Sequence, residues 1–164
     1  MMTADQTAGD CRHPAIGIDE MGRIADALAA AKSRQDVEAA MSIYHPDCVL
    51  EAPSLVSRHQ GAEQIRSALE GFFKRFPDYS VELGGRAIGG DTLLAWGTIH
   101  LTLTGRPGGQ SPNGRRSSVP VFILFRFADG QVIWESFNFD LASLCRQSGV
   151  STDALVPNGV EEGA

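Results

Sequence analysis

The amino-acid sequence predicts a single α+β domain in which helices come first and an antiparallel sheet follows. Apolar residues recur at helical spacing in the first half of the chain, and this spacing gives way to alternation after Pro77. Glycine-containing turns separate the alternating segments, as in a sheet of consecutive hairpins. In a chain of 164 residues we expect one domain over residues 18–150, a flexible arm over residues 1–17 and a flexible tail over residues 151–164.

Three segments have the apolar spacing of helices, and we expect them to span roughly residues 19–31, 34–44 and 61–76. Asp19 is a candidate N-cap of the first segment, and Pro46 stops the second. The third segment has the clearest helical pattern, because "FPD" ends it after one wide apolar face. That face consists of Ile65, Ala68, Leu69, Phe72, Phe73 and Phe76.

Strand patterns account for the rest of the domain. The string "CVLEAP" predicts a short strand between the second and third helices. Four longer strands follow as "YSVELGGRAIGG", "DTLLAWGTIHLTLTG", "RSSVPVFILFRF" and "QVIWESFNFD". The junctions "GGD" and "ADGQ" supply the residues of positive φ that tight hairpin turns need, and "GRPGGQSPNGR" is a longer connection. We therefore expect a four-stranded antiparallel meander with the helices on one face.

Composition and charge argue against several classes of function. The formal net charge of −6 and the pI near 5.1 do not fit a nucleic-acid-binding protein, which needs a concentrated basic surface. No apolar run is long enough to span a membrane, and the N-terminus lacks the pattern of a secretory signal. The cysteines form no CxxC pair and the histidines lack the i,i+4 spacing of a helical zinc site. We predict a reduced, cytoplasmic protein without a metal.

The last predicted strand carries the first indication of a functional site. Trp134, Ser136, Asn138 and Asp140 share one of its faces, and a tryptophan fits a solvated face badly. A second mixed face, on the strand before the long connection, consists of Leu94, Trp96, Thr98, His100 and Thr102. Aromatic rings among a few polar groups are typical of a ligand pocket. The opposite faces are also apolar, so we expect helices to cover one side of the sheet and a second subunit of a homodimer the other.

Asp140 has two interpretations from the residues alone. It ends a strand and precedes "LASLCRQ", so it fits the N-cap of a short terminal helix. It also fits an acid/base group, if its strand face lines the pocket. The direction of its pKa separates the two, because helix amides lower the pKa of a capping carboxylate whereas desolvation raises that of a buried one.

Four local motifs, in this order, resemble those of SnoaL-like proteins in the nuclear transport factor 2-like superfamily. They are a G-x-x-x-I helix start, an F-P-D helix end, an F-x-F-x-D-G-x-I/V turn, and an aromatic strand that closes on Asp before L-x-x-L-x-x-Q-x-G. In this chain they stand in "RHQGAEQIRSALEGFFKRFPDYSVEL" and "FRFADGQVIWESFNFDLASLCRQSG". The resemblance runs from about Ala25 to Val150.

The resemblance implies a cone, in which a curved antiparallel sheet wraps around three helices and encloses a pocket, usually in a dimer. In polyketide cyclases of the family, the aspartate that closes the last strand points into the pocket as a general acid/base, and Asp140 occupies that position. The same region also resembles limonene epoxide hydrolase. Residues 98–100 stand where that enzyme has its Arg-x-Asp pair, however, and Val49 and Glu51 where it has tyrosine and asparagine.

We therefore hypothesise a cofactor-free enzyme, of the polyketide cyclase or isomerase type, that acts on a small apolar carbonyl compound. Asp140 would move the proton, and His100 would polarise the carbonyl with help from Asn138. The other candidate ligand contacts are Trp96, Trp134, Phe122, Glu51 and Tyr44. Two alternatives stay open, a non-catalytic module that binds an apolar ligand and a dimerisation domain with a filled cone. Epoxide hydrolysis is the least favoured of the functions considered.

Overall fold

The computed structural model describes residues 16–156, and within them four α-helices pack against one six-stranded sheet. The helices are α1 (Ile18–Ser33), α2 (Val37–Ile43), α3 (Ala62–Arg75) and α4 (Leu141–Ser148). The strands are β1 (Tyr44–Ala52), β2 (Ser57–Gln60), β3 (Ser80–Gly89), β4 (Thr92–Thr102), β5 (Arg116–Ala128) and β6 (Gln131–Phe139). Short 3₁₀ turns are η1 (Pro53–Leu55), η2 (Pro107–Gly109) and η3 (Thr152–Ala154). The predicted α+β class, with three helices before four long strands, is confirmed.

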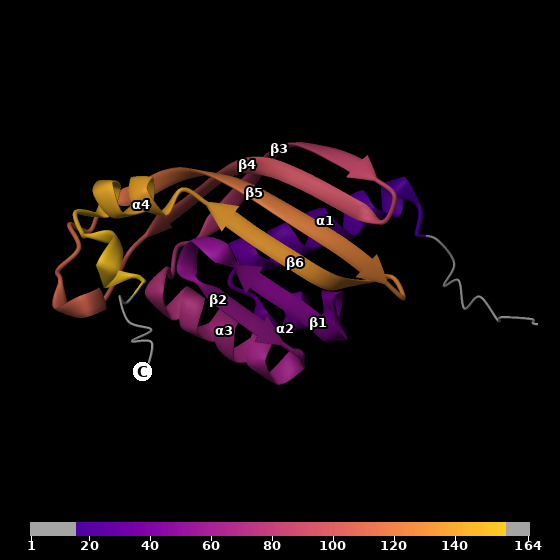
Figure 1. Ribbon diagram of the computed structural model, residues 1–164, viewed down its shortest axis with the longest axis horizontal. Helices are drawn as coiled ribbons and strands as arrows, with labels where there is room; N and C mark the ends of the chain where they lie inside the picture. The colour runs from indigo at the N-terminus through magenta and orange to yellow at the C-terminus, as the bar shows by residue number, and fades with distance from the viewer. Residues whose placement is uncertain (1–15, 157–164) are drawn as a thin grey trace, which may run out of the picture.

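The sheet has the strand order β2-β1-β6-β5-β4-β3. Strand β1 runs parallel to β6, and the other neighbouring strands are antiparallel, so the sheet is mixed rather than purely antiparallel. Figure 1 shows the sheet curving over α1, with α3 beside β1 and β2. Helix α4 lies at the end of the sheet opposite the β5–β6 turn (Figure 1).

Turn residues and glycines set the shape of the sheet. Asp129 and Gly130, both at positive φ, form the two-residue turn that pairs Ala128 with Gln131. In β3 the register shifts after Leu83, and the indole of Trp96 lies so close to Gly85 that a Cβ there would collide with it. Such irregularities bend a sheet, and the bend lets this one wrap around the helices.

The two sides of the sheet differ in what covers them. The helix-facing side carries the core, which includes Leu93, Ile99, Leu101, Val121, Ile123 and Phe125. The outer side carries the alternate residues, and there Trp96 is 39% and Phe122 53% exposed. Residues 151–156, which we expected to begin a loose tail, instead pack on the domain through Ala154 and Leu155. Most of the predicted N-terminal arm lies outside the described residues.

Candidate functional site

A cavity of about 300 Å³ opens between α3, the β1–β2 hairpin and the helix-facing side of β6. Its apolar wall includes Leu50, Leu69, Phe72, Phe76, Phe137 and Leu155. The polar and charged residues that line it are Lys32, Ser57, His59, Arg75 and Tyr79. A mostly apolar cavity with a few polar groups is the usual form of a small-molecule site.

A buried ion pair joins the floor of this cavity to the sheet. Lys32 lies in the last turn of α1, where a cation is favoured by the helix dipole, and its Nζ donates to Oε1 and Oε2 of Glu135 at 2.7 and 2.9 Å. The side chain of Lys32 is 10% exposed and that of Glu135 is fully buried. An ammonium group has three N–H donors, so Lys32 keeps one for a ligand after both carboxylate contacts.

Three further groups surround Glu135. The hydroxyl of Tyr44 donates to Glu135 Oε2. Burial raises the pKa of Tyr44 well above its ordinary value, and the negative charge of Glu135 and this hydrogen bond raise it further. Burial also raises the pKa of Tyr79, again reinforced by Glu135, and that of the Cys48 thiol to about 12. Both tyrosines and the cysteine therefore stay protonated near neutral pH and serve as hydrogen-bond donors or packing groups.

His59 is the residue of the cavity lining whose side-chain type most often serves as a general acid or base in enzymes. Strand pairing places His59 in one row across the sheet with Glu135, because Glu135 pairs with Leu50 and Leu50 pairs with His59. Neighbouring strands lie about 4.8 Å apart, so the row places the backbones of Glu135 and His59 about 10 Å from each other. The imidazole makes no hydrogen bond to any other residue in the described part of the chain.

The residues that the sequence predicted for the pocket lie mainly on the other side of the sheet. Trp96 pairs with Phe122, and Phe122 pairs with Asn138, so the structure does bring these three together. They form a row on the outer side, however, and none of them lines the cavity. The face predicted to line a pocket therefore does not line this cavity, because alternation identifies the residues that share a face but not the face that the helices cover.

Asp140 and His100 do not meet in the cavity either. Asp140 caps α4, accepting from Ser143 N at 2.9 Å and from Ser143 Oγ at 2.6 Å, and it is exposed. These hydrogen bonds lower the pKa of Asp140, which is the direction we expected for a cap. On the outer side, His100 Nδ1 lies 2.8 Å from Ser118 Oγ, and Nε2 lies 3.7 Å from Glu82 Oε2. The geometry expected for an acid/base pair is therefore absent.

The remaining predicted contacts divide between the two sides. Trp134 lies on the outer side, where the guanidinium of Arg126 stacks over its ring at 5.1 Å. Glu51 pairs with Arg58 at 3.1 Å, away from the cavity lining. Tyr44 is the predicted contact that the structure joins to the site, through Glu135 rather than by lining the cavity.

Four residues of the site, Lys32, Glu135, His59 and Arg75, were not predicted from the sequence. A signal for the first two was present, since each interrupts an apolar stripe. Lys32 follows Leu28 by one helical turn, and Glu135 stands between apolar residues of a strand face. One lysine and one glutamate on two core-facing stripes predict a buried pair, because an unpaired buried charge is too costly. His59 and Arg75 gave no such signal.

The chain shares its fold with solved structures described as ketosteroid isomerase-like and NTF2-like. The family model of the SnoaL-like domain matches residues 25–135 of the sequence, and the chain belongs to that family. None of the helices from residue 16 to residue 156 is long and apolar enough to cross a membrane.

Solved structures with the same fold come from several bacteria. A hypothetical protein with a ketosteroid isomerase-like fold from Catenulispora acidiphila, in complex with trimethylamine, is 20% identical with a TM-score of 0.70, covering 79% of this chain and 95% of that chain. A presumed SnoaL-like polyketide cyclase from Jannaschia sp. CCS1 is 20% identical with a TM-score of 0.71, over 81% and 94% of the two chains. An LEH-like epoxide hydrolase from M. tuberculosis is 20% identical with a TM-score of 0.64, covering 79% of this chain and 90% of that chain. These similarities show a shared fold. No curated protein sequence matches the chain.

Proposed function

We propose that the protein is a cofactor-free enzyme that moves a proton next to the carbonyl of a small, largely apolar substrate. The substrate lies in the cavity between α3 and the sheet, and the reaction class is that of a polyketide cyclase or isomerase. Fold neighbours named as a polyketide cyclase and an epoxide hydrolase agree with small-molecule chemistry in this fold, but the activity proposed for this chain rests on its own residues.

The observation that carries this proposal is the Lys32–Glu135 ion pair against an apolar cavity. A buried ion pair contributes little to stability compared with apolar residues of the same volume, so a role in binding or chemistry gives a better reason for it. The Tyr44 hydroxyl donates to Glu135 and holds its carboxylate in place, and that carboxylate in turn holds the ammonium group of Lys32. The free N–H of Lys32 is then a fixed donor for a carbonyl oxygen.

The proton transfer follows from this arrangement. His59 takes a proton from the carbon next to the carbonyl, the C–H electron pair moves into the enolate, and Lys32 stabilises the resulting oxyanion. Return of a proton from His59 to the same or another carbon gives exchange or isomerisation. A cavity of about 150 Å³ holds one benzene ring, so this one is of a size for a two-ring substrate.

One observation favours the alternative, a module that binds an apolar ligand without turning it over. A catalytic base is usually oriented by a third group, and within residues 16–156 the His59 ring has no hydrogen-bond partner. In this alternative Lys32 still holds the ligand oxygen and no proton moves. Binding is common to both functions, so the experiment must measure proton transfer.

Exchange of the α-protons of 2-tetralone in D₂O, followed by proton NMR, measures the proposed step without knowledge of the natural substrate. We expect the protein to accelerate exchange, and His59→Gln to lower the accelerated rate by about 10²-fold or more. The double variant Lys32→Met/Glu135→Gln should lose a comparable factor without leaving an unpaired buried charge.

Variants of residues away from the cavity are matched controls for this experiment. His100→Gln and Asp140→Asn should leave the exchange rate unchanged, because neither residue lines the cavity. Tetralone binding without exchange would support the binding module. A loss of exchange in His100→Gln but not in His59→Gln would contradict the proposed site.

A further inference from the structure

Arg75 gives the cavity a charge that the proposed proton transfer does not use. It is the last residue of α3 and it lines the cavity. Because Arg75 is exposed whereas Lys32 of the same lining is buried, Arg75 marks the solvent side of the cavity. Its guanidinium makes no hydrogen bond or ion pair with any residue of the described chain. Arg66 on the same helix differs, because it forms a two-point ion pair with Glu38.

The backbone of Arg75 is held in place although its side chain is free. Its carbonyl oxygen accepts hydrogen bonds from Thr104 N at 3.0 Å and from Thr104 Oγ1 at 2.9 Å. These bonds satisfy a carbonyl at the end of a helix and fix the point from which the guanidinium projects. Arginine presents a planar set of donors that matches a carboxylate at two points.

The charges around the cavity favour an anion at this point. Glu135 balances the charge of Lys32, and no aspartate or glutamate is among the described residues that line the cavity. Arg75 is therefore left as the uncompensated permanent charge of that lining. The adjacent wall is apolar and includes Phe72 and Phe76, so a free inorganic anion would meet few partners there.

We propose that the ligand is an apolar carboxylic acid, with its rings in the cavity and its carboxylate on Arg75 at the mouth. This inference rests on the proposed function, because it takes the cavity as the substrate site, and it narrows the substrate from an apolar ketone to an apolar keto acid. Arg75 fixes the acid end, and Lys32 meets the carbonyl oxygen at the floor. Arg75 is thus a specificity-determining residue.

Calorimetric titration with a matched pair of probes, 2-naphthoate and 2-naphthamide, tests the inference at a pH of about 8, where histidine is ordinarily neutral. The two probes share shape and differ in charge. We expect the protein to bind the acid about two- to fivefold more tightly than the amide, the range for an exposed ion pair. Arg75→Gln should abolish this preference while leaving amide binding unchanged, and Arg75→Lys should keep part of it.

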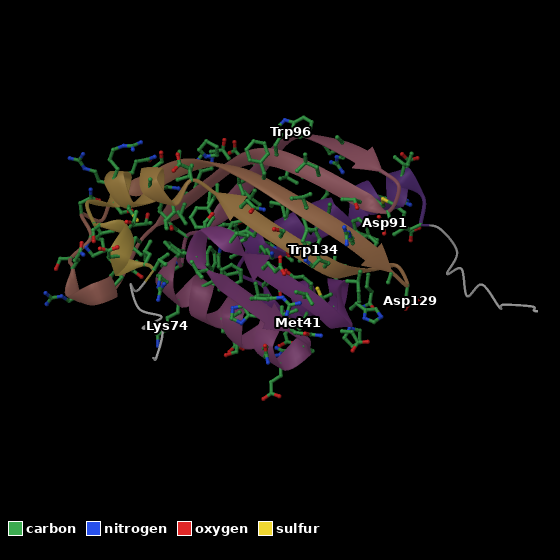
Figure 2. The ribbon with its side chains drawn as sticks, in the orientation of Figure 1. Met41, Lys74, Asp91, Trp96, Asp129 and Trp134 are labelled. Atoms are coloured by element: carbon green, nitrogen blue, oxygen red, sulfur yellow. The ribbon has the colours of Figure 1, made fainter. Side chains whose placement is uncertain are left out.

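Lys74→Gln is the matched control, since it removes the same charge from the neighbouring residue. Lys74 is exposed, does not line the cavity and projects away from the domain (Figure 2). It should keep the full preference for the acid. Equal affinity of both probes for the unmodified protein, an equal effect of Arg75→Gln and Lys74→Gln, or binding of neither probe would each overturn the inference.

The exchange assay with uncharged 2-tetralone separates this inference from the proposed function. A preference for the acid without exchange would leave Arg75 as the anion contact of a binding module. Exchange without a preference for the acid would support the proposed enzyme and contradict the role of Arg75.

Discussion

The contact between Lys32 and Glu135 places two opposite charges where water has little access. Replacing one member of such a pair leaves the other charge buried without a partner, and that destabilises a protein by about 3 kcal/mol or more. We expect Glu135→Gln to lower the free energy of unfolding by about 3 kcal/mol, measured by urea denaturation. Lys32→Met/Glu135→Gln should recover most of this loss. Equal stability of Glu135→Gln and the unmodified protein would contradict the buried pair.

Asp140 adds a pH dependence that follows from its cap. Hydrogen bonds from the Ser143 side chain and backbone lower the pKa of Asp140 below the ordinary value of 3.8, so folding favours its ionised form. The stabilisation is fully present above that value and is lost as the pH falls through the lower folded-state pKa. Carboxylate titration by NMR, with Asp140→Asn to assign the signal, should show this direction. Asp140→Ala should lower the thermal midpoint more than Asp140→Asn, because asparagine also caps helices.

Single residues also mark the limit of prediction from the sequence. The alternation of residues correctly placed Trp96 on one face of its strand and Asn138 on one face of another. In the structure, pairing through β5 joins these two faces into one. It did not say which face the helices cover, because both faces of these strands carry aromatic residues. The cap at Asp140 was one of two interpretations, and only three-dimensional exposure separates them.

Among the strands, β3 and β4 approach each other very closely at Gly97. A Cβ at this position would collide with the carbonyl of Glu82 and crowd the Cα of Leu83. We expect Gly97→Ala to destabilise the fold by about 2 kcal/mol, because strand backbones cannot move apart without losing their hydrogen bonds. Gly89→Ala is the matched control, since Gly89 also lies in this hairpin and a Cβ there would meet no other atom within 4 Å. Denaturant midpoints that fall equally in both variants would contradict the close approach.

Helices and strands with a regular spacing of apolar residues were predictable from the sequence. A short polar strand and the pairing of strands that are distant in the chain were not. The helix that became α3 and the four strands after it have clear patterns and turn residues. β2 has only the polar residues "SRHQ", and its pairing with β1 defines it rather than any apolar pattern. The parallel pairing of β1 with β6 joins residues from opposite ends of the domain, and no local signal specifies such a pairing.

At the scale of the whole molecule, the outer side of the sheet exposes large apolar side chains. Trp96 and Phe122 are exposed neighbours there, and Arg126 and Trp134 extend the surface. We propose that a second copy of the chain covers this side and forms the homodimer expected from the sequence. Light scattering at micromolar concentration should give twice the mass of one chain.

Phe122→Glu should convert this dimer to a monomer, because it places a charge at the centre of the apolar surface. Ile18→Glu is the control, since Ile18 is 66% exposed at the start of α1, far along the chain from the outer strands. It should leave the mass unchanged. A single-chain mass for the unmodified protein would rule out the proposed interface.

The central claim is that ligands enter the cavity on the helix-facing side of the sheet and not the outer side. A titration with 2-tetralone, followed by ¹⁵N–¹H NMR, tests it most directly, because the chain's two tryptophans both lie on the outer side. Figure 2 shows Trp96 pointing away from the helices. We predict shifts in the backbone amides of Ser57, His59 and Phe72, with both indole N–H signals unchanged. Shifted indole signals with unchanged cavity amides would contradict the claim.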